Sequence, residues 1–289
     1  MNDSDRPITP LQRIGCVSYL NAKPLIDGLE SERDLSVRFD VPSRLRSDLA
    51  SGEADLALCP VFDYFAAAAS EDTGDRLTLV PVGGIGCDGP TLTVRLYSRV
   101  PVKQITTLYT DTDSHTSAAL VRILLSELFD TRPRIIDYHA REEVAEGRLA
   151  GQPEAVLLIG DKVVTGSPPA VTYRYQLDLG EAWQSLTGLP FVFAMWMTRA
   201  GTELGDLPLR LAGRLEANLP QRVLIAERHA ERHGWPTELA EHYLVDVLRY
   251  RVGARELEAV GRYGRLLERY GLVGRVPANL DLWAGSGVR

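Results

Sequence analysis

The clearest local pattern in the chain is Ser43-Arg44-Leu45-Arg46-Ser47-Asp48-Leu49-Ala50-Ser51-Gly52-Glu53-Ala54-Asp55-Leu56-Ala57-Leu58. Leu45 and Leu49 lie one helical turn apart, so residues 43–51 are predicted to form a short amphipathic helix. Gly52 follows directly and is the residue type that most often ends a helix. Residues 54–58 then form a short apolar run, typical of a buried strand.

The alternation of strands and helices continues on both sides of this segment, which predicts an α/β protein with largely parallel sheets. Further strands are predicted at residues 13–19, 35–41, 77–82, 91–98, 105–110, 134–138, 155–159, 171–177 and 191–198. Further helices are predicted at residues 24–29, 116–129 and 180–185. From Leu207 onward the pattern predicts three charged amphipathic helices, at about 208–232, 237–249 and 254–270, and no strand.

Length and composition favour two lobes and argue against several classes of partner. A chain of 289 residues exceeds most single cores, and two lobes imply a cleft between them. The net charge of −7, with scattered Lys and Arg, argues against binding to nucleic acid or an anionic membrane. A site for an anionic ligand must therefore be built locally.

The N-terminal residues and the cysteines predict a cytoplasmic protein. Residues 1–10 lack the apolar run of a secretory signal, and the longest apolar stretches, 61–69 and 189–197, fall short of the ~20 residues that span a bilayer. Cys16, Cys59 and Cys87 are odd in number and far apart, so neither a disulfide framework nor a zinc site is expected.

Two patterns imitate known sites. Gly84-Ile85-Gly86-Cys87-Asp88-Gly89 has the spacing of the dinucleotide fingerprint, but strand-like residues follow it where that fingerprint requires a helix. We expect a glycine-rich loop between strands instead, where a backbone can approach a ligand. The second pattern, His229, Glu231 and His233, lacks zincin spacing and predicts a solvated helix face. No cofactor and no metal are expected.

The segment Thr110-Asp111-Thr112-Asp113-Ser114-His115-Thr116-Ser117 leaves a predicted strand and opens a predicted helix. Hydroxyls and free backbone N–H groups therefore converge at a helix N-terminus, which predicts an anion site. The alternative interpretation is simple N-capping by Ser114 or Thr116. Asp111, Asp113 and Asp161 are interpreted as turn formers or caps rather than as catalytic carboxylates.

The chain resembles the chorismate dehydratases of menaquinone biosynthesis over about residues 12–272. The segments that carry the resemblance are Ser18-Tyr19-Leu20-Asn21-Ala22-Lys23-Pro24-Leu25, Gly52-Glu53-Ala54-Asp55-Leu56-Ala57-Leu58, Asp113-Ser114-His115-Thr116-Ser117, Leu157-Leu158-Ile159-Gly160-Asp161, Asp178-Leu179-Gly180-Glu181-Ala182-Trp183, Thr187-Gly188-Leu189-Pro190-Phe191-Val192 and Arg249-Tyr250.

The resemblance implies a two-lobed fold like that of the type II periplasmic binding proteins, with C-terminal helices added. Residues 1–92 and 196–289 would form lobe 1 and residues 93–195 lobe 2, with a hinge near 91–98 and 189–198. The fold alone would also suit a solute receptor. The later enzyme that makes 1,4-dihydroxy-6-naphthoate is a second alternative, but it carries a His where this chain has Gly160-Asp161.

The resemblance also implies the substrate and the site. The ligand would be chorismate, a small dicarboxylate, and the oligomeric state is left open. Asn21 is the expected catalytic residue, because its amide offers two donors and an acceptor; an Asx turn ahead of Pro24 is the alternative. Many relatives carry Arg where this chain has His115. The expected substrate-binding residues are Ser18, Tyr19, Cys87, Gly89, Pro90, Ser114, His115, Thr116, Ser117, Gly160 and Asp161.

Overall fold

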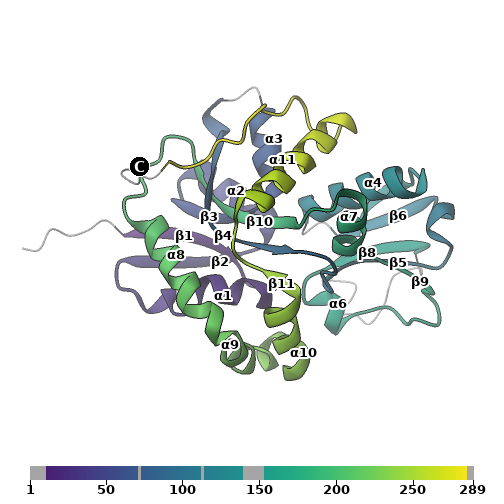
Figure 1. The fold of residues 1–289 in the computed structure, drawn as a ribbon, viewed down its shortest axis with the longest axis horizontal. Helices are drawn as coiled ribbons and strands as arrows, with labels where there is room; N and C mark the ends of the chain where they lie inside the picture. Colours follow the sequence, from purple (N-terminus) through teal and green to yellow (C-terminus); the bar gives the residue numbers. More distant parts are fainter. Residues whose placement is uncertain (1–10, 71–72, 112–113, 139–152, 285–289) are drawn as a thin grey trace, which may run out of the picture.

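A computed structural model describes residues 11–70, 73–111, 114–138 and 153–284, which form two sheets surrounded by helices (Figure 1). The first sheet has six strands. In spatial order these are β11 (Leu248–Arg249), β4 (Leu77–Cys87), β10 (Phe191–Arg199), β3 (Leu56–Pro60), β1 (Gln12–Val17) and β2 (Leu35–Asp40). β1 pairs in parallel with β2 and β3, whereas β10 runs antiparallel to β3 and β4.

The second sheet has five strands. In spatial order these are β7 (Arg134–Tyr138), β6 (Thr107–Asp111), β8 (Ala155–Ile159), β5 (Val94–Ser98) and β9 (Tyr175–Asp178). β6 pairs in parallel with β7 and β8, and β5 is antiparallel to β8 and β9. Both sheets are therefore parallel on one side and antiparallel on the other.

Helices cover both sheets (Figure 1). Those around the first sheet are α1 (Lys23–Ile26), α2 (Pro42–Ser51), α3 (Val61–Ala68), α8 (Leu207–Asn218), α9 (Arg222–His229), α10 (Thr237–His242) and α11 (Ala254–Arg269). Those around the second are α4 (His115–Phe129), α6 (Lys162–Thr165) and α7 (Leu179–Thr187). α11 packs against both α3 and α4, so the last long helix contacts elements beside each sheet.

Residues 42–60 contain the predicted helix and strand. Leu45 and Leu49 of α2 are 0% and 1% exposed, and Gly52 ends the helix with a left-handed φ of 73°. β3 is buried along its whole length, as a strand flanked by neighbours on both sides must be.

The chain passes between the sheets twice. It leaves the first sheet after Cys87 and enters the second at Val94, and it returns between Asp178 and Phe191. The division into lobes at residues 92/93 and 195/196 stays a prediction, as does the hinge.

The prediction of a glycine-rich loop is wrong for residues 84–87, because these residues continue strand β4. A Cβ atom at Gly84 would lie 2.7 Å from the carbonyl oxygen of Ala194, and one at Gly86 would lie 2.6 Å from that of Phe191. The glycines therefore let the backbone of β10 approach β4 closely, which explains glycine within a strand.

The helix prediction for the C-terminal region is also wrong in part. α8 and α9 are separate helices, and the predicted helix over 237–249 becomes α10, a π-helical segment at Tyr243–Val247 and strand β11. β11 pairs with β4 through Leu248 and Arg249. A two-residue strand is too short to show a period of two, so the pattern could not reveal it.

Candidate functional site

A cavity of about 70 Å³ lies between the two sheets. Its walls come from segments that follow parallel strands in both sheets, which is where α/β proteins place their ligands. The lining residues are Val17, Tyr19, Asn21, Pro42, Leu58, Pro60, Ile85, Thr91, Thr93, Val94, Ser114, Thr116, Ser117, Ile159, Gly160, Phe193, Ala194, Tyr243 and Leu248.

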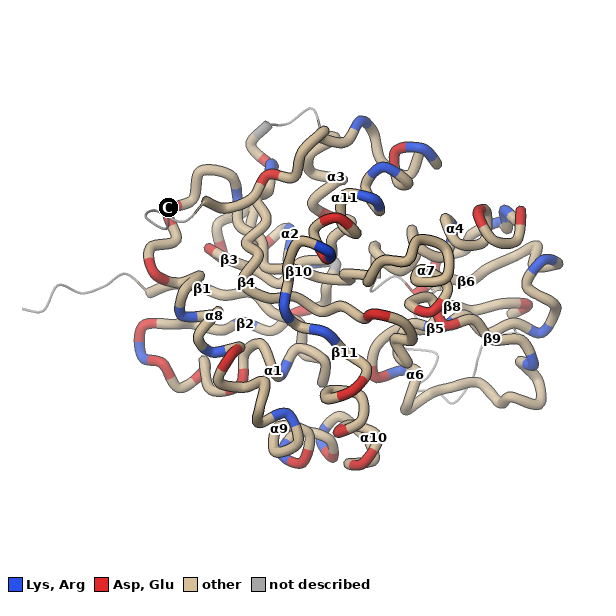
Figure 2. The backbone as a smooth tube through the Cα atoms, in the orientation of Figure 1, with Lys and Arg blue, Asp and Glu red and all other residues tan. Residues whose placement is uncertain are grey.

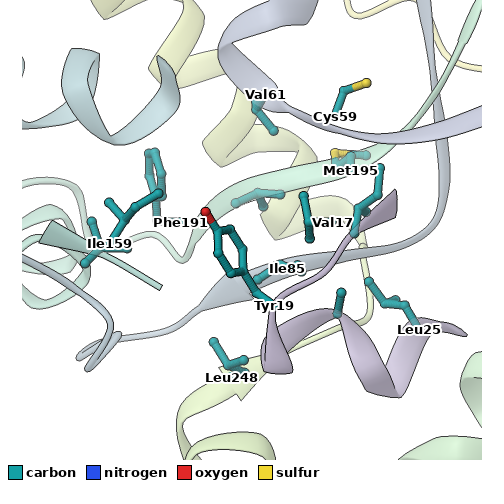
Figure 3. Close-up of a cluster of buried hydrophobic side chains, with 14 of the residues drawn as sticks. Val17, Tyr19, Leu25, Cys59, Val61, Ile85, Ile159, Phe191, Met195 and Leu248 are labelled. Atoms are coloured by element: carbon teal, nitrogen blue, oxygen red, sulfur yellow. The ribbon is translucent and has the colours of Figure 1, made fainter. Parts of the chain in front are cut away.

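Much of the wall is apolar. Figure 3 shows the ring of Tyr19 among Ile85, Leu248 and Ile159. The polar lining residues are all neutral, so the described wall contains no charged side chain. Figure 2 shows Lys and Arg interspersed with Asp and Glu on the surrounding elements. A ligand anion in this cavity would be held by dipoles and hydrogen bonds rather than by a cation.

Asn21 lies in the turn after β1. The turn is a single 3-10 segment, Leu20–Ala22, that leads into α1, where Pro24 is suited to the first helical turn. The side-chain oxygen of Asn21 is buried and accepts no hydrogen bond from any described residue. The alternative of an Asx turn, which needs this oxygen as its acceptor, is therefore wrong. The oxygen is an unsatisfied acceptor in the cavity wall.

The N-terminus of α4 forms the opposite wall. Ser114 is the N-cap, and its Oγ accepts from the backbone N–H of Ser117 at 3.1 Å and donates to Oγ of Ser117 at 2.8 Å. Thr116 Oγ1 accepts from the N–H of Phe62 at 3.1 Å and donates to the carbonyl of Phe193 at 3.2 Å. The capping interpretation thus holds for Ser114, yet all three hydroxyl residues line the cavity. Thr112 and Asp113 lie outside the described residues.

A buried carboxylate organises the first passage between the sheets. Asp178 accepts from the backbone N–H groups of Thr91 and Leu92, each at 2.9 Å, and caps α7 by accepting from Gly180 and Glu181. Leu92 has a φ of 64°, a strained value for a residue with a side chain. The two bonds to Thr91 and Leu92 hold the segment that presents Thr91 to the cavity, and the other two join it to the start of α7. The sequence identifies Asp178 only as part of the motif Asp178-Leu179-Gly180-Glu181-Ala182-Trp183 and does not predict this role.

Tyr243 is the largest polar residue in the wall that sequence reasoning missed. Its ring is 1% exposed, and its hydroxyl lies 2.6 Å from Oγ1 of Thr93. Burial raises the pKa of this hydroxyl, and hydrogen bonds with Thr93 and Asn21 offset part of that rise. Tyr243 opens a π-helical segment, a rare form found frequently at functional sites. Nothing in the residue pattern around 243 signals this form.

The structure brings together half of the expected site. The expected residues that line the cavity are Tyr19, Asn21, Ser114, Thr116, Ser117 and Gly160. Gly160 has a φ of 61°, its N–H donates to the carbonyl of Thr93, and its α-carbon faces the ring of Tyr19. Those that do not line the cavity are Ser18, Cys87, Gly89, Pro90, His115 and Asp161.

The residues outside the cavity have other surroundings. Ser18 is exposed. Cys87 is fully buried against Gly180 of α7, and burial raises the pKa of its thiol to about 12. Gly89 packs on the side chain of Gln184, and Pro90 is exposed. Cys87 and Gly89 therefore contact α7 rather than the cavity, whereas Thr91, further along the same loop, lines it.

His115 and Asp161 both have protein partners. His115 Nδ1 lies 2.7 Å from Oδ1 of Asp63, and this hydrogen bond raises the pKa of the imidazole. Asp161 accepts from Nε1 of Trp235 at 2.9 Å, and its other oxygen lies 3.0 Å from Nδ1 of His233. Asp161 follows β8 of the second sheet, whereas Trp235 lies between α9 and α10, so this contact bridges the two sides of the molecule.

No group of three or more His, Cys, Asp or Glu side chains suited to a metal ion occurs in the described parts of the chain. Across the same residues, every helix is too short or too polar to cross a bilayer.

Solved structures with the same fold include several solute-binding proteins. The alkanesulfonate-binding protein SsuA of Xanthomonas axonopodis pv. citri superposes with a TM-score of 0.67 at 18% identity, covering 93% of this chain and 96% of that one. The sulphonate-binding SsuA of Escherichia coli gives 0.63 at 16% identity, covering 93% and 95%. Protein AF1704 of Archaeoglobus fulgidus gives 0.66 at 12% identity, covering 90% and 98%. The expected periplasmic-binding-protein-like fold is confirmed.

Sequence comparison gives the family. A chorismate dehydratase of Thermus thermophilus is 30% identical over 246 residues, which is 80% of this chain and 86% of that protein. A family model described as menaquinone biosynthesis matches residues 12–269. The chain therefore belongs to the menaquinone-biosynthesis family.

Proposed function

We propose that this protein is a chorismate dehydratase, a hydro-lyase that converts chorismate to 3-[(1-carboxyvinyl)oxy]benzoate and water. The observation that carries the proposal is the neutral cavity between the two sheets, with Asn21 on one wall and the N-terminus of α4 on the other, in a chain of this family. The reaction removes the hydrogen at ring carbon C3 and the hydroxyl at C4, and the ring becomes aromatic.

The reaction needs two things that this cavity offers. The first is a site for a carboxylate, which the N-terminus of α4 supplies through its dipole and the hydroxyl of Ser117, since Ser114 donates its own hydroxyl proton to Ser117. The second is a largely apolar environment, in which hydrogen bonds to developing charge are stronger than in water. Negative charge that spreads from C3 toward the ring carboxylate would be stabilised at the helix N-terminus.

Asn21 is the proposed catalytic residue. Its carboxamide lines the cavity beside the hydroxyl of Tyr243, and its oxygen has no partner among the described residues, so it is free to bind the substrate. Neutral hydrogen-bonding groups can orient the C4 hydroxyl and hold the ring for elimination. The proton from C3 would pass to the enolpyruvyl carboxylate of the substrate, because the described wall has no ionised base.

The position after β8 also fits a dehydratase better than the naphthoate-forming enzyme, in which a His at this place is thought to be the base. Here Gly160 lines the cavity, and the carboxylate of Asp161 is bonded to Trp235 and His233 instead. The segment after β8 therefore brings no ionisable side chain to the described wall.

We further propose that residues 1–92 with 196–289 and residues 93–195 act as two lobes that close on the substrate. We also place the enzyme in the cytoplasm, where its three buried free cysteines would stay reduced.

The test is incubation of the purified protein with chorismate, without added metal or nucleotide, followed by liquid chromatography and mass spectrometry. We expect 3-[(1-carboxyvinyl)oxy]benzoate to appear in proportion to enzyme concentration. A folded protein that leaves chorismate unchanged at high enzyme concentration would overturn the proposal. The control is a parallel incubation with the Asn21→Ala variant, which separates enzymatic product from spontaneous decay of chorismate.

A further inference from the structure

Side chains of the C-terminal helical region contact the second sheet beside the cavity. Nδ1 of His233 lies 3.0 Å from Oδ2 of Asp161, and Nε1 of Trp235 donates to Oδ1 of the same carboxylate at 2.9 Å. The hydroxyl of Tyr243 lies 2.6 Å from Oγ1 of Thr93. We call these contacts the clasp, because they join elements from the two sides of the molecule.

The contacts of the clasp are linked on both of its sides. Thr93 precedes β5 and Asp161 follows β8, which is the neighbour of β5 in the second sheet. The N–H of Gly160 donates to the carbonyl of Thr93 at 2.8 Å, so these two strand ends are bonded to each other. On the opposite side the ring of Trp235 stacks on that of Tyr243, with centroids 4.8 Å apart and an interplanar angle of 19°. The contacts are therefore expected to form and break together.

The clasp borders a cavity that is too small for the substrate. Thr93, Gly160 and Tyr243 all line it, and its volume of about 70 Å³ is that of two or three water molecules. Typical ligand sites measure ~300–1,000 Å³. A ring with two carboxylates and an enolpyruvyl ether therefore needs the walls to move apart. Because Thr93 and Tyr243 come from different walls, this movement breaks the contact between them.

We propose that the clasp is an autoinhibitory contact: it holds the cavity in an arrangement that excludes the substrate, and it breaks when the substrate binds. The proposal rests on the proposed dehydratase activity, which makes chorismate the ligand. Only molecules with a broken clasp bind chorismate, so the clasp lowers the apparent affinity in proportion to the fraction of molecules in which it is formed. Weakening the clasp should therefore tighten binding.

The first test is His233→Ala. His233 lies outside the described cavity wall, so this change weakens the clasp and leaves the lining groups in place. We expect KM for chorismate to fall by about threefold to tenfold, the factor that one hydrogen bond contributes to an equilibrium, while kcat is unchanged because the clasp is absent from the complex. General damage to the site would raise KM instead.

The matched control for His233→Ala is His242→Ala, which breaks an exposed pair with Asp246 in the same region of the chain. We expect this variant to keep the wild-type KM. A KM that is unchanged or raised in His233→Ala, or lowered equally in both variants, would overturn the proposal.

The second test locks the clasp with a disulfide. A Cβ at Gly234 would lie 3.0 Å from Cγ2 of Thr165, about the separation that a disulfide requires between the Cβ of one cysteine and the sulfur of the other. Neither residue lines the cavity, and the native cysteines are buried. Gly234 has a left-handed φ of 73°, so a side chain there is strained, and the reduced form of the same variant is the reference.

We expect the oxidised Thr165→Cys/Gly234→Cys variant to turn over chorismate at least about tenfold more slowly than its reduced form, and reduction to restore the rate. The single variant Thr165→Cys, treated in the same way, controls for effects of the oxidant. Mass spectrometry establishes that the disulfide has formed. Equal rates in the disulfide-bonded and reduced forms would show that substrate binding does not require the clasp to break.

Hydrogen exchange separates the clasp from the proposed function, because it needs no turnover. A wild-type protein inactive on chorismate would overturn the proposed function, but the indole N–H of Trp235, which is bonded to Asp161, would still report opening of the clasp. We expect this N–H to exchange about threefold to tenfold faster in His233→Ala and more slowly in the disulfide-bonded form than in its reduced form.

The internal control is the indole N–H of Trp183, which donates to the carbonyl of Pro190 at 2.9 Å, away from the clasp. Its exchange rate should be the same in every variant. If the rate at Trp235 is also the same in every variant, the clasp does not open as a unit and the inference is wrong.

Discussion

Asn21 has a buried carboxamide oxygen that forms no hydrogen bond with any described residue. Replacing Asn21 with Ala removes the carboxamide and leaves the backbone of the Leu20–Ala22 turn free to form, because no cap in that turn uses the side chain. We expect kcat on chorismate to fall by about 10²–10³, the usual loss when one preorganised hydrogen-bonding group is removed from an active site. Steady-state kinetics measure this.

Circular dichroism and the melting temperature provide the control for N21A, since a folded variant should match the wild type in both. Full turnover by a folded N21A would remove Asn21 from the catalytic machinery.

His115 gives a pH dependence to stability rather than a contact with the cavity. Its pKa is raised in the folded protein, chiefly by the hydrogen bond with Asp63, so the folded state favours the imidazolium. This contribution is fully present below the unfolded pKa of about 6.5 and is lost as pH rises through the folded pKa. We expect the free energy of unfolding, from urea titrations at pH 6 to 9, to show this loss in wild type.

His115→Gln and Asp63→Asn should each abolish that component of the pH profile, because each removes one partner of the pair. A profile that keeps its shape in both variants would show that another group is responsible.

Among the residues that line the cavity, the sequence predicted those that directly follow a strand. It did not predict residues that come from distant parts of the chain. Asn21, Ser114 and Gly160 each follow a parallel strand, so their place in the cavity follows from topology. Tyr243 reaches the same cavity from 150 residues beyond Thr93, through a π-helical segment. A local sequence pattern cannot predict a contact between residues so far apart in the chain.

The proposed anion site lies at the N-terminus of helix α4, where the hydroxyl side chains have different hydrogen-bond partners. Thr116 holds α3 and β10 through the two bonds of its hydroxyl. Among the described residues, the hydroxyl of Ser117 bonds only to the cap residue Ser114. We therefore expect Ser117→Ala to raise KM for chorismate by about threefold to tenfold with kcat little changed, because ground-state and transition-state binding fall together.

The matched control for Ser117→Ala is Ser126→Ala, on the same helix but outside the cavity wall. An unchanged KM in Ser117→Ala, or an equal rise in both variants, would contradict a role for Ser117 in binding the substrate.

Two glycines on α11 allow a test of how closely this helix packs against α3. A Cβ at Gly264 would lie 2.3 Å from the ring of Phe65, which is buried in a T-shaped contact with Tyr64 and cannot easily move. We expect Gly264→Ala to destabilise the protein by about 1–3 kcal/mol in urea unfolding, the usual cost of overpacking.

Gly261 lies on the same helix, and a Cβ there would meet only the end of the Arg265 side chain at 3.5 Å. We expect Gly261→Ala to stabilise the protein by about 0.5–1 kcal/mol through helix propensity. Equal effects of the two substitutions would show that packing of α11 on α3 is not the cause.

Among the elements, the predictions succeeded where packing and periodicity agree. The strand bounds at residues 134–138 and 155–159 match β7 and β8. The prediction failed where glycine composition was taken for a loop, because β4 needs glycine to lie close to β10. Tertiary contact with a strand that is distant in sequence decided this segment, and such contact is invisible in a local pattern.

For the whole molecule, Asp161 ties the two sides together through His233 and Trp235. Its expected role in binding the ligand stays a prediction. Asp161→Ala would leave the N–H of Trp235 and the ring of His233 without their acceptor. We expect a loss of about 1–3 kcal/mol in the free energy of unfolding, the cost of an unsatisfied buried donor.

The control for Asp161→Ala is Asp246→Ala, which breaks the exposed pair with His242 and should cost less than about 1 kcal/mol. Equal losses in the two variants would mean that the Asp161 contact is no more than a surface pair.

The order of strands in the first sheet has a consequence for synthesis on the ribosome. β10 lies between β3 and β4, but it is made only after every strand of the second sheet has been translated. The second sheet can therefore fold first as a local unit. Until β10 is made, β3 and β4 each have one edge without its pairing strand. Newly made chains that stop before residue 191 should be the most prone to aggregate, and a chaperone that shields β3 should act during that interval.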